Sequence, residues 1–151
     1  IEINIEENLQ CQRTRYGRGI PQGKLIEAVS KLNTGGKYDS KAFKKSVGLN
    51  GVGIKAVNAL SNRFEVRSYR EGKVRIAIFE KGILQSDVTE ACNEESGTYI
   101  FFEPDSTLFL NYSFQANFVE MLLRNYTYLN TGLSIIYNGQ RIIHATVWKI
   151  C

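Results

Sequence analysis

The chain has 151 residues, of which 43% are hydrophobic and 23% are charged, and its formal net charge is +4 at pH 7. These values are typical of one ordinary globular domain and argue against a disordered chain. No apolar run approaches the roughly 20 residues needed to cross a bilayer, so no membrane partner is expected. Three widely spaced cysteines and a single histidine, His144, argue against a zinc site, a disulfide framework and a catalytic triad, and favour reduced thiols in the cytoplasm.

The first part of the chain predicts two strands, a loop and a short helix. Ile1, Ile3 and Ile5 alternate with polar residues, which indicates a half-buried strand. A second strand is expected at 9–16, although the residues around Arg13 give it no clean apolar face. The run G-R-G-I-P at 17–21 breaks that strand, and a helix is predicted at 24–32. The basic segment 37–47 is predicted to be a mobile loop, either a lid or a solvated connector.

A glycine-rich stretch then runs directly into a helical pattern. Gly48, Gly51 and Gly53 fall within six residues, and apolar residues at helical spacing follow them. Free backbone N–H groups at a helix start, together with the close approach that glycine permits, suit a phosphate group. A flexible loop is the alternative, because short glycine motifs often match by accident.

The second part predicts strands joined by hairpins, with a helix between them. Strands are expected at 63–69, 74–79, 97–103, 133–137 and 141–145, with hairpin turns at 70–73 and at Asn138-Gly139. The polar segment 86–96 is predicted to be a loop. Ser113 is expected to cap a helix that packs its apolar residues into the core: Phe114, Phe118, Met121, Leu122 and Tyr126. This order predicts an α+β two-layer sandwich with helices on one face of a mixed, mostly antiparallel sheet.

Five short motifs occur in a characteristic order: G-R-G-I-P at 17–21, T-G-G-K-Y-D at 34–39, G-L-N-G-V-G at 48–53, V-N-A-L-S at 57–61 and G-T at 97–98. Together they resemble the ATPase domain of the B subunits of bacterial type II DNA topoisomerases, gyrase and topoisomerase IV. The form S-V-G-L-N-G-V-G is closer to the topoisomerase IV-like subunits. The resemblance implies the GHKL, or Bergerat, ATP-binding fold. It also implies that residues 1–151 are a single N-terminal ATPase domain fragment, which lacks the first helix and the transducer domain that follows.

The resemblance also implies where ATP would bind. The implied positions are Gly17, Gly19, Ile20 and Pro21 beside the adenine; Lys37, Val47, Gly48, Leu49, Asn50, Gly51, Val52 and Gly53 around the phosphates; and Thr98 near the adenine. Arg18 and Arg70 match arginines at the pocket rim. Without the motifs, the alternative for the two arginines is an ion pair on the surface. The alternative for Lys37 is a solvated loop residue, and for Thr98 it is an ordinary strand hydroxyl. No catalytic or metal-binding residue is expected within the chain, because the family's catalytic glutamate and its Mg²⁺-binding asparagine lie on a helix before the first strand.

One residue departs from the family pattern. Arg15 stands where relatives have an aspartate that accepts a hydrogen bond from the adenine amino group, and arginine has no acceptor. Either the pocket is degenerate or the sequence is locally out of frame, and we favour the second interpretation. Codons exist for which a one-base shift turns C-Q-R-T-R into V-S-V-R-D, and a two-base shift of the tail A-T-V-W-K-I-C gives N-G-L-E-D-L. The native codons decide between these alternatives.

The leading functional hypothesis is an ATPase domain fragment that powers ATP-dependent DNA strand passage. The full protein would act on DNA with a topoisomerase A subunit, would dimerise through its B subunits on binding ATP, and would be cytoplasmic in a bacterium. The fragment alone is expected to be weak or inactive. The alternatives are another ATPase of the superfamily, a catalytically silent nucleotide-binding or interaction module, and simple salt-dependent DNA binding.

Overall fold

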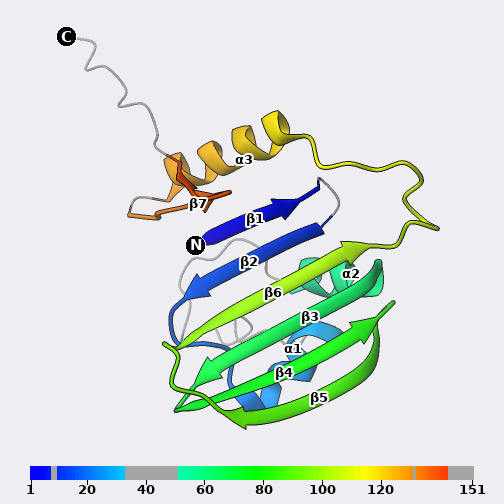
Figure 1. Ribbon diagram of the computed structural model, residues 1–151, viewed down its shortest axis with the longest axis vertical. Coiled ribbons are helices and arrows are strands. Elements are labelled where there is room, and N and C mark those ends of the chain that lie inside the picture. The colour runs from blue at the N-terminus through cyan, green and yellow to red at the C-terminus, as the bar shows by residue number, and fades with distance from the viewer. Residues whose placement is uncertain (8–9, 33–50, 131, 143–151) are drawn as a thin grey trace.

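The computed structural model describes residues 1–7, 10–32, 51–130 and 132–142, which include one eight-stranded sheet (Figure 1). The strands are β1 (Glu2–Glu6), β2 (Gln10–Tyr16), β3 (Ser61–Arg70), β4 (Lys73–Glu80), β5 (Ile83–Ala91), β6 (Gly97–Pro104), β7 (Ile136–Tyr137) and β8 (Gln140–Arg141). Their order is β5-β4-β3-β6-β2-β1-β7-β8. Every neighbouring pair with a described register is antiparallel except β1 and β7, which are parallel. The predicted α+β fold is confirmed.

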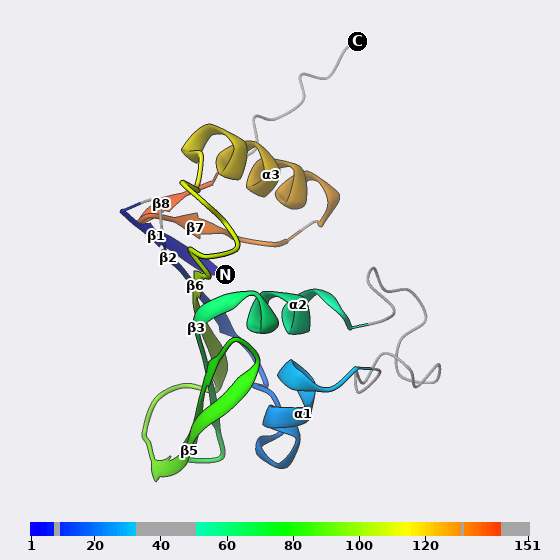
Figure 2. The same ribbon diagram turned by 90° about the vertical axis from the view of Figure 1, so that its right-hand side faces the viewer.

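The helices cover one face of this sheet (Figure 2). They are the 3₁₀ turn η1 (Gln22–Lys24), α1 (Leu25–Ser30), α2 (Gly53–Ala59) and α3 (Ala116–Leu129). The predicted helix at 24–32 is therefore present but shorter. Within the described ranges, no helix is long and apolar enough to span a membrane.

Two hydrophobic clusters lie between the helices and the sheet. The larger one joins α1 to the middle of the sheet and consists of Leu25, Val29, Phe64, Val66, Ala77 and Phe79, each at most 1% exposed. Its strand residues alternate along β3 and β4, because every second side chain of a strand points to the same face. The smaller cluster lies under α3 and consists of Leu123, Ile135 and Ile142, with Ile3 packed against it.

Both predicted hairpin turns are confirmed. Glu71 and Gly72 join β3 to β4 with φ of 55° and 72°, and Asn138 and Gly139 join β7 to β8 with φ of 46° and 78°. Two successive residues at positive φ are typical of the type I′ turn, whose twist matches that of the strands it connects.

The loop predicted at Ser86–Ser96 is wrong for most of its length, because β5 extends from Ile83 to Ala91. Within the described ranges, this strand lies at the edge of the sheet and pairs with β4 alone. Eight of its nine residues are exposed, and its apolar residues do not alternate with polar ones, so the sequence carries no alternating apolar signal. Backbone pairing to β4 forms the strand instead.

The predicted start and packing of α3 are also wrong. The helix begins at Ala116 after Gln115, with no side-chain cap, and the Ser113 hydroxyl accepts a hydrogen bond from Gln115 Nε2 at 2.9 Å instead. The stripe expected in the core is largely exposed: Phe118 59%, Met121 51%, Leu122 54% and Tyr126 58%. Leu123 and Thr127 are the buried positions of this helix. Because α3 is apolar on more than one side, its sequence could not indicate which side faces the sheet.

Candidate functional site

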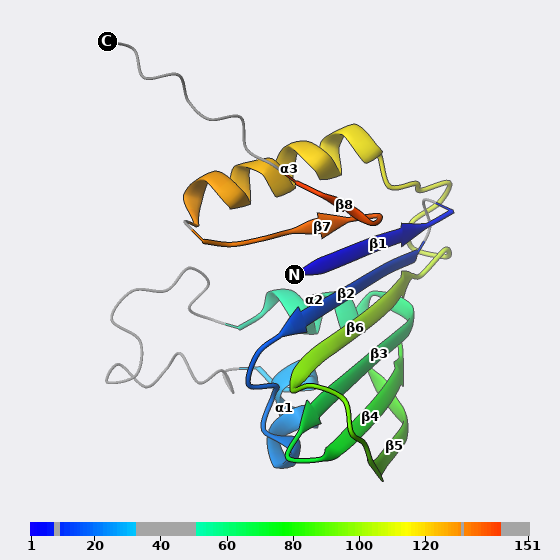
Figure 3. The same ribbon diagram turned by 60° about the vertical axis from the view of Figure 1, so that its left-hand side comes forward.

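A row of polar side chains crosses three neighbouring strands on the face that carries the helices. Arg15 of β2 pairs in register with Thr98 of β6, and Thr98 pairs with Ser68 of β3. Directly opposed residues in antiparallel strands point to the same face, so these three side chains share one row. Figure 3 shows β2, β6 and β3 side by side in this order. The row thus supplies polar groups next to the otherwise apolar core.

The G-R-G-I-P loop lies against this row and is held by specific contacts. The Ser68 hydroxyl donates to the Ile20 carbonyl at 2.6 Å, and the Gly17 N–H donates to the Ser96 carbonyl at 3.1 Å. Gly19 has φ of +68°, and a Cβ there would lie 2.7 Å from the Tyr69 carbonyl oxygen. Only glycine fits a left-handed backbone at such a close approach. The conformation of the loop is therefore fixed by these hydrogen bonds and by the close packing of Gly19.

A second set of contacts fixes the segment just after the loop. The Arg75 guanidinium donates to the Gln22 carbonyl and also forms two bonds with the Asp87 carboxylate, at 2.8 and 2.7 Å. The Gln22 side chain donates in turn to the Lys73 carbonyl at 3.1 Å. The hydrogen bond from Arg75 lowers the pKa of Asp87 below its ordinary value, because it stabilises the ionised carboxylate. Strands β4 and β5 thus anchor the end of the loop.

The loop and the row enclose a cavity of about 220 Å³. It is lined by Arg15, Gly17, Arg18, Gly19, Ile20 and Thr98. The charged side chains in this lining are the two arginines, so the cavity favours anionic or acceptor-rich ligands. A second cavity, of about 490 Å³, also touches Arg15 and Thr98, but Thr14, Tyr16, Tyr69 and Tyr99 line it, and these alternate with the polar row and so point to the opposite face of the sheet.

The structure therefore brings together one part of the predicted site. Gly17, Gly19, Ile20, Thr98, Arg18 and the divergent Arg15 surround a single cavity, whereas Pro21 precedes η1 outside its lining. Arg70 ends β3, where its guanidinium donates to the Glu71 carboxylate at 2.8 Å. A surface ion pair is the alternative to a pocket-rim role that the sequence left open for Arg70. The binding roles of all these residues remain predictions.

The predicted phosphate-binding segment is described only at its end. Lys37, Val47, Gly48, Leu49 and Asn50 lie outside the described residues. Gly51 has φ of 56°, and Val52 and Gly53 lie at the start of α2. Gly53 lines a separate cavity of about 410 Å³ together with Cys11 and Arg13.

Burial raises the pKa of the Cys11 thiol to about 11. This thiol is therefore neutral at pH 7, which does not suit a nucleophile. Within the described part of the chain, no group of three or more histidine, cysteine, aspartate or glutamate side chains is placed to hold a metal ion.

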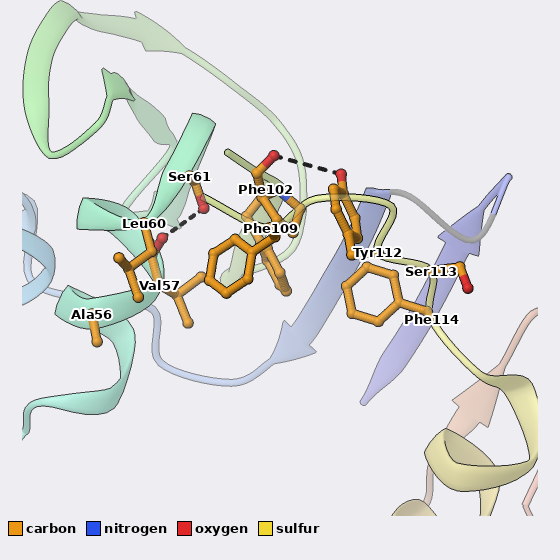
Figure 4. A pocket seen from close by; sticks show the side chains of 10 residues that line it. Ala56, Val57, Leu60, Ser61, Phe102, Phe109, Tyr112, Ser113 and Phe114 are labelled. Atoms are coloured by element: carbon orange, nitrogen blue, oxygen red, sulfur yellow. Dashed lines mark hydrogen bonds between the residues drawn. The ribbon is translucent and has the colours of Figure 1, made fainter. Parts of the chain in front are cut away.

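A further cavity of about 360 Å³ is almost entirely apolar (Figure 4). Its walls are Val57 of α2, Leu60 just after that helix, Phe102 of β6, and three residues from the segment after β6: Phe109, Tyr112 and Phe114. The polar groups drawn there already have partners, since the Ser61 hydroxyl donates to the Val57 carbonyl at 2.6 Å and the Tyr112 hydroxyl to the Pro104 carbonyl at 3.5 Å. We assign it no chemistry.

Sequence reasoning missed the residues that support the loop. Ser68 follows Phe64 and Val66 at the same alternating positions of β3, so a hydroxyl occupies a place where the pattern predicts an apolar side chain. This polar residue at an expected apolar position was the sequence signal that could have indicated the role of Ser68. Gly97 was found as part of the G-T motif, but the reason for a glycine there was not: a Cβ would lie 2.7 Å from the Arg15 carbonyl oxygen. This close approach depends on the pairing of β2 with β6, which the sequence did not reveal.

Comparison with solved structures identifies the class of this fold. The ATPase region of Saccharomyces cerevisiae topoisomerase II, solved bound to ICRF-187, matches 95% of this chain and 43% of its own, with a TM-score of 0.78 and 22% identity. The 43K ATPase domain of Thermus thermophilus gyrase B, solved with an aminocoumarin, matches 95% of this chain and 39% of its own, with a TM-score of 0.73 and 24% identity. The fold is that of the ATPase region of type II topoisomerases.

Comparison with curated proteins gives the more particular relationship. The chain is 50% identical over 140 residues to the B subunit of DNA topoisomerase 4 from Borreliella burgdorferi, covering 93% of this chain and 23% of that protein. It is 37% identical to the equivalent protein of Bartonella bacilliformis, covering 91% and 22%, and 35% identical to the B subunit of DNA gyrase from Haloferax volcanii, covering 93% and 24%. No family model matches.

Over most of its length, the chain is thus homologous to the B subunits of type II DNA topoisomerases, which confirms the resemblance seen in the motifs. It spans about a quarter of the length of these relatives.

Proposed function

We propose that this chain is the nucleotide-binding part of a type II topoisomerase B subunit, and that residues 1–151 form one ATPase domain fragment. In the whole protein, ATP binding would bring two B subunits together and would drive passage of DNA with a partner A subunit, in the cytoplasm. The free thiols Cys11 and Cys92 are compatible with that compartment. The fragment by itself is expected to hydrolyse ATP weakly or not at all.

One observation carries the proposal. The G-R-G-I-P loop is hydrogen-bonded to Ser68 of the polar row and lines a cavity beside it, in a fold shared with topoisomerase ATPase regions. The Thr98 hydroxyl, which can donate and accept, lines this cavity next to Gly17 and Gly19. Because Gly19 has no side chain, the loop backbone packs closely on the Tyr69 and Gly97 carbonyls of β3 and β6 while it lines the cavity. A planar base is the part of a nucleotide that suits this wall.

The proposal also assigns binding roles that rest on the family resemblance alone. Lys37 and the segment from Val47 to Gly53 would contact the phosphates, and Arg18 and Arg70 would lie at the rim. The described residues do not fit a magnesium site, since they hold no suitable cluster of metal-ligating side chains. The family's Mg²⁺-binding asparagine and catalytic glutamate would instead belong to a helix before β1.

Calorimetric titration of the chain with ATP and magnesium tests the proposal. We expect weak binding, and tighter ATP binding by Arg15→Asp, because an acceptor then faces the adenine amino group. The complete gene product should show ATP-dependent DNA strand passage when mixed with its A subunit. Absence of binding by both forms, together with no ATP-dependent activity of the complete protein, would overturn the proposal.

Arg15 also favours a second candidate, a catalytically silent nucleotide-binding or interaction module. Its guanidinium has only donors, and it lines the cavity where the resemblance requires an acceptor. A silent module predicts that the complete gene product lacks ATPase activity even with Arg15→Asp, although the chain is folded. Restored hydrolysis in that variant would instead favour the topoisomerase function.

A further inference from the structure

The face of the sheet opposite the helices carries the cavity of about 490 Å³. Figure 1 looks onto this face, with α1 and α2 behind the strands. Tyr69 of β3, Gly97 of β6 and Tyr16 of β2 form one row, because Gly97 pairs in register with both tyrosines. Neighbouring strands lie about 4.8 Å apart, so the backbones of the two tyrosines are about 9.6 Å apart. The glycine between them has no side chain, and the row therefore leaves a gap between two aromatic residues.

The rest of the lining adds a third ring and acidic groups. Tyr99 of β6 points to the same face, because it lies two positions beyond the glycine of the row. Glu94 and Glu95, from the segment that joins β5 to β6, also line the cavity. The Tyr16 hydroxyl donates to Glu2 Oε1 at 3.2 Å, which brings a further carboxylate to this end of the sheet. The cavity thus combines aromatic faces with negative charge.

The electrostatic environment of Tyr16 shows the sign of the potential here. Its hydrogen bond to Glu2 is the largest cause of a pKa raised above the ordinary value. The negative charges of Glu94 and Glu95 raise this pKa further, because they oppose the formation of a phenolate. Charges that oppose an anion at this position attract a cation.

Two arginines lie next to the cavity, and neither directs its charge into it. The Arg67 guanidinium lies 4.9 Å from the centre of the Tyr99 ring, and its charge is paired with the Glu65 carboxylate at 2.6 Å. Arg15 belongs to the polar row on the other face. Within the described ranges, no cluster of carboxylates is placed to hold a metal ion. Aromatic faces beside carboxylates suit an organic cation instead.

We propose that this cavity binds an alkylammonium cation, such as the end of a lysine side chain or of a free diamine. The tyrosine rings would contact the cation through their faces, and Glu94 and Glu95 would accept its hydrogen bonds. Each ring should improve the affinity by about 2- to 30-fold, which spans exposed and desolvated cation–π contacts. The site lies on the opposite face from the proposed nucleotide cavity, so it goes beyond the proposed function and does not depend on it.

Binding of small amines to the 151-residue chain tests the proposal. The probes are the diamine cadaverine and Nα-acetyl-lysine methylamide, and the neutral control is the Nε-acetylated form of the lysine probe. Amide chemical shifts measured by NMR report binding, and the signals of Gly97 and Tyr99 should shift. We expect both amines to bind and the neutral control not to bind. Tighter binding of the lysine probe would support a protein as the source of the cation, and tighter binding of cadaverine would support a free polyamine.

Substitutions of one exposed tyrosine separate ring contact from general attraction. Tyr16→Leu should weaken the binding of both amines about 2- to 30-fold, whereas Tyr16→Phe keeps the ring and should retain most of the affinity. Tyr126→Leu on α3 is the matched control, because Tyr126 is 58% exposed and Tyr16 is 57% exposed. This control should bind both amines like the unmodified chain. Glu94→Gln combined with Glu95→Gln should weaken both amines as well. Circular dichroism establishes that each variant is folded.

Several results would overturn the proposal. Equal binding of the neutral control would show that the charge is not recognised. Unchanged binding in Tyr16→Leu, or an equal loss in Tyr126→Leu, would show that the aromatic cavity is not the site. Failure of the folded, unmodified chain to bind either amine would also overturn the proposal, and the proposed function would stand or fall separately on the titration with ATP.

Discussion

The two halves of the sheet differ in how closely the helices pack on them. Under α1, six apolar side chains are at most 1% exposed, and Asn58 ties α2 to this region by donating to the Val29 carbonyl at 3.0 Å. Under α3, the cluster is smaller, and Leu123 and Ile142 are each 8% exposed. The candidate site belongs to the closely packed half, since its loop is hydrogen-bonded to Ser68 of β3 and the segment just after the loop to Arg75 of β4. A site that must hold a ligand in one orientation benefits from such a rigid support.

Truncation of the larger core should give the greatest loss of stability. Phe64 is fully buried and makes an edge-to-face contact with Phe79, with ring centroids 6.1 Å apart. Phe64→Ala should lower the free energy of unfolding by about 3–5 kcal/mol, measured by urea denaturation. Phe118→Ala, on the exposed side of α3, should cost less than about 1 kcal/mol. Equal losses would contradict the difference in packing between the two halves.

A pair of adjacent leucines tests the packing of α3 itself. Leu123 is 8% exposed and Leu122 is 54% exposed. Leu123→Ala should cost about 2–3 kcal/mol, because it removes buried methyl groups and leaves a cavity, whereas Leu122→Ala should cost about 0.5 kcal/mol or less. The same denaturant titration measures both. A larger loss from Leu122 would show that α3 buries its other side.

Substitution of a loop glycine tests the rigidity of the site. Gly19→Ala places a Cβ 2.7 Å from the Tyr69 carbonyl oxygen at a positive φ, so it should cost about 1–3 kcal/mol and should weaken nucleotide binding. Gly23→Ala is the control, because no atom lies within 4 Å of its Cβ position. Thermal unfolding and competition binding give the two readouts. Identical behaviour of both variants would remove the argument for a fixed loop.

The smallest expected effect is on the dependence of stability on pH. Arg75 lowers the pKa of Asp87 below 3.8, so the folded state binds this proton less readily than the unfolded state. The stability that this pair contributes is therefore full above about pH 4–5 and is lost as the pH falls below 3.8 toward the folded pKa. Asp87→Asn should be less stable at neutral pH and should lose less stability between pH 5 and pH 2.5. A steeper acid loss in the variant would contradict this assignment.

The parts of the site that the sequence predicted are those fixed by local chemistry. Gly17, Gly19 and Thr98 were found because glycine-rich motifs keep their order and spacing along the chain, and the structure places all three around one cavity. Ser68 and Arg75 were missed, because their function depends on which strands lie beside the loop. The pairing of β3 with β6, and the contact of Arg75 with Gln22, join segments that lie far apart in the sequence, and no local pattern encodes them.

The sequence by itself determined the strands β1, β3, β4 and β6, two of the three type I′ hairpins and the family resemblance of the chain, because turn chemistry and strand patterns act over a few residues; it missed the third turn, Lys81-Gly82, which joins β4 to β5. Only the tertiary structure decided that β5 is an edge strand, that β2 lies between β1 and β6, and that α3 buries Leu123 rather than Leu122. Backbone hydrogen bonds to neighbouring strands, and competition between two apolar sides of one helix, are settled only when distant segments meet.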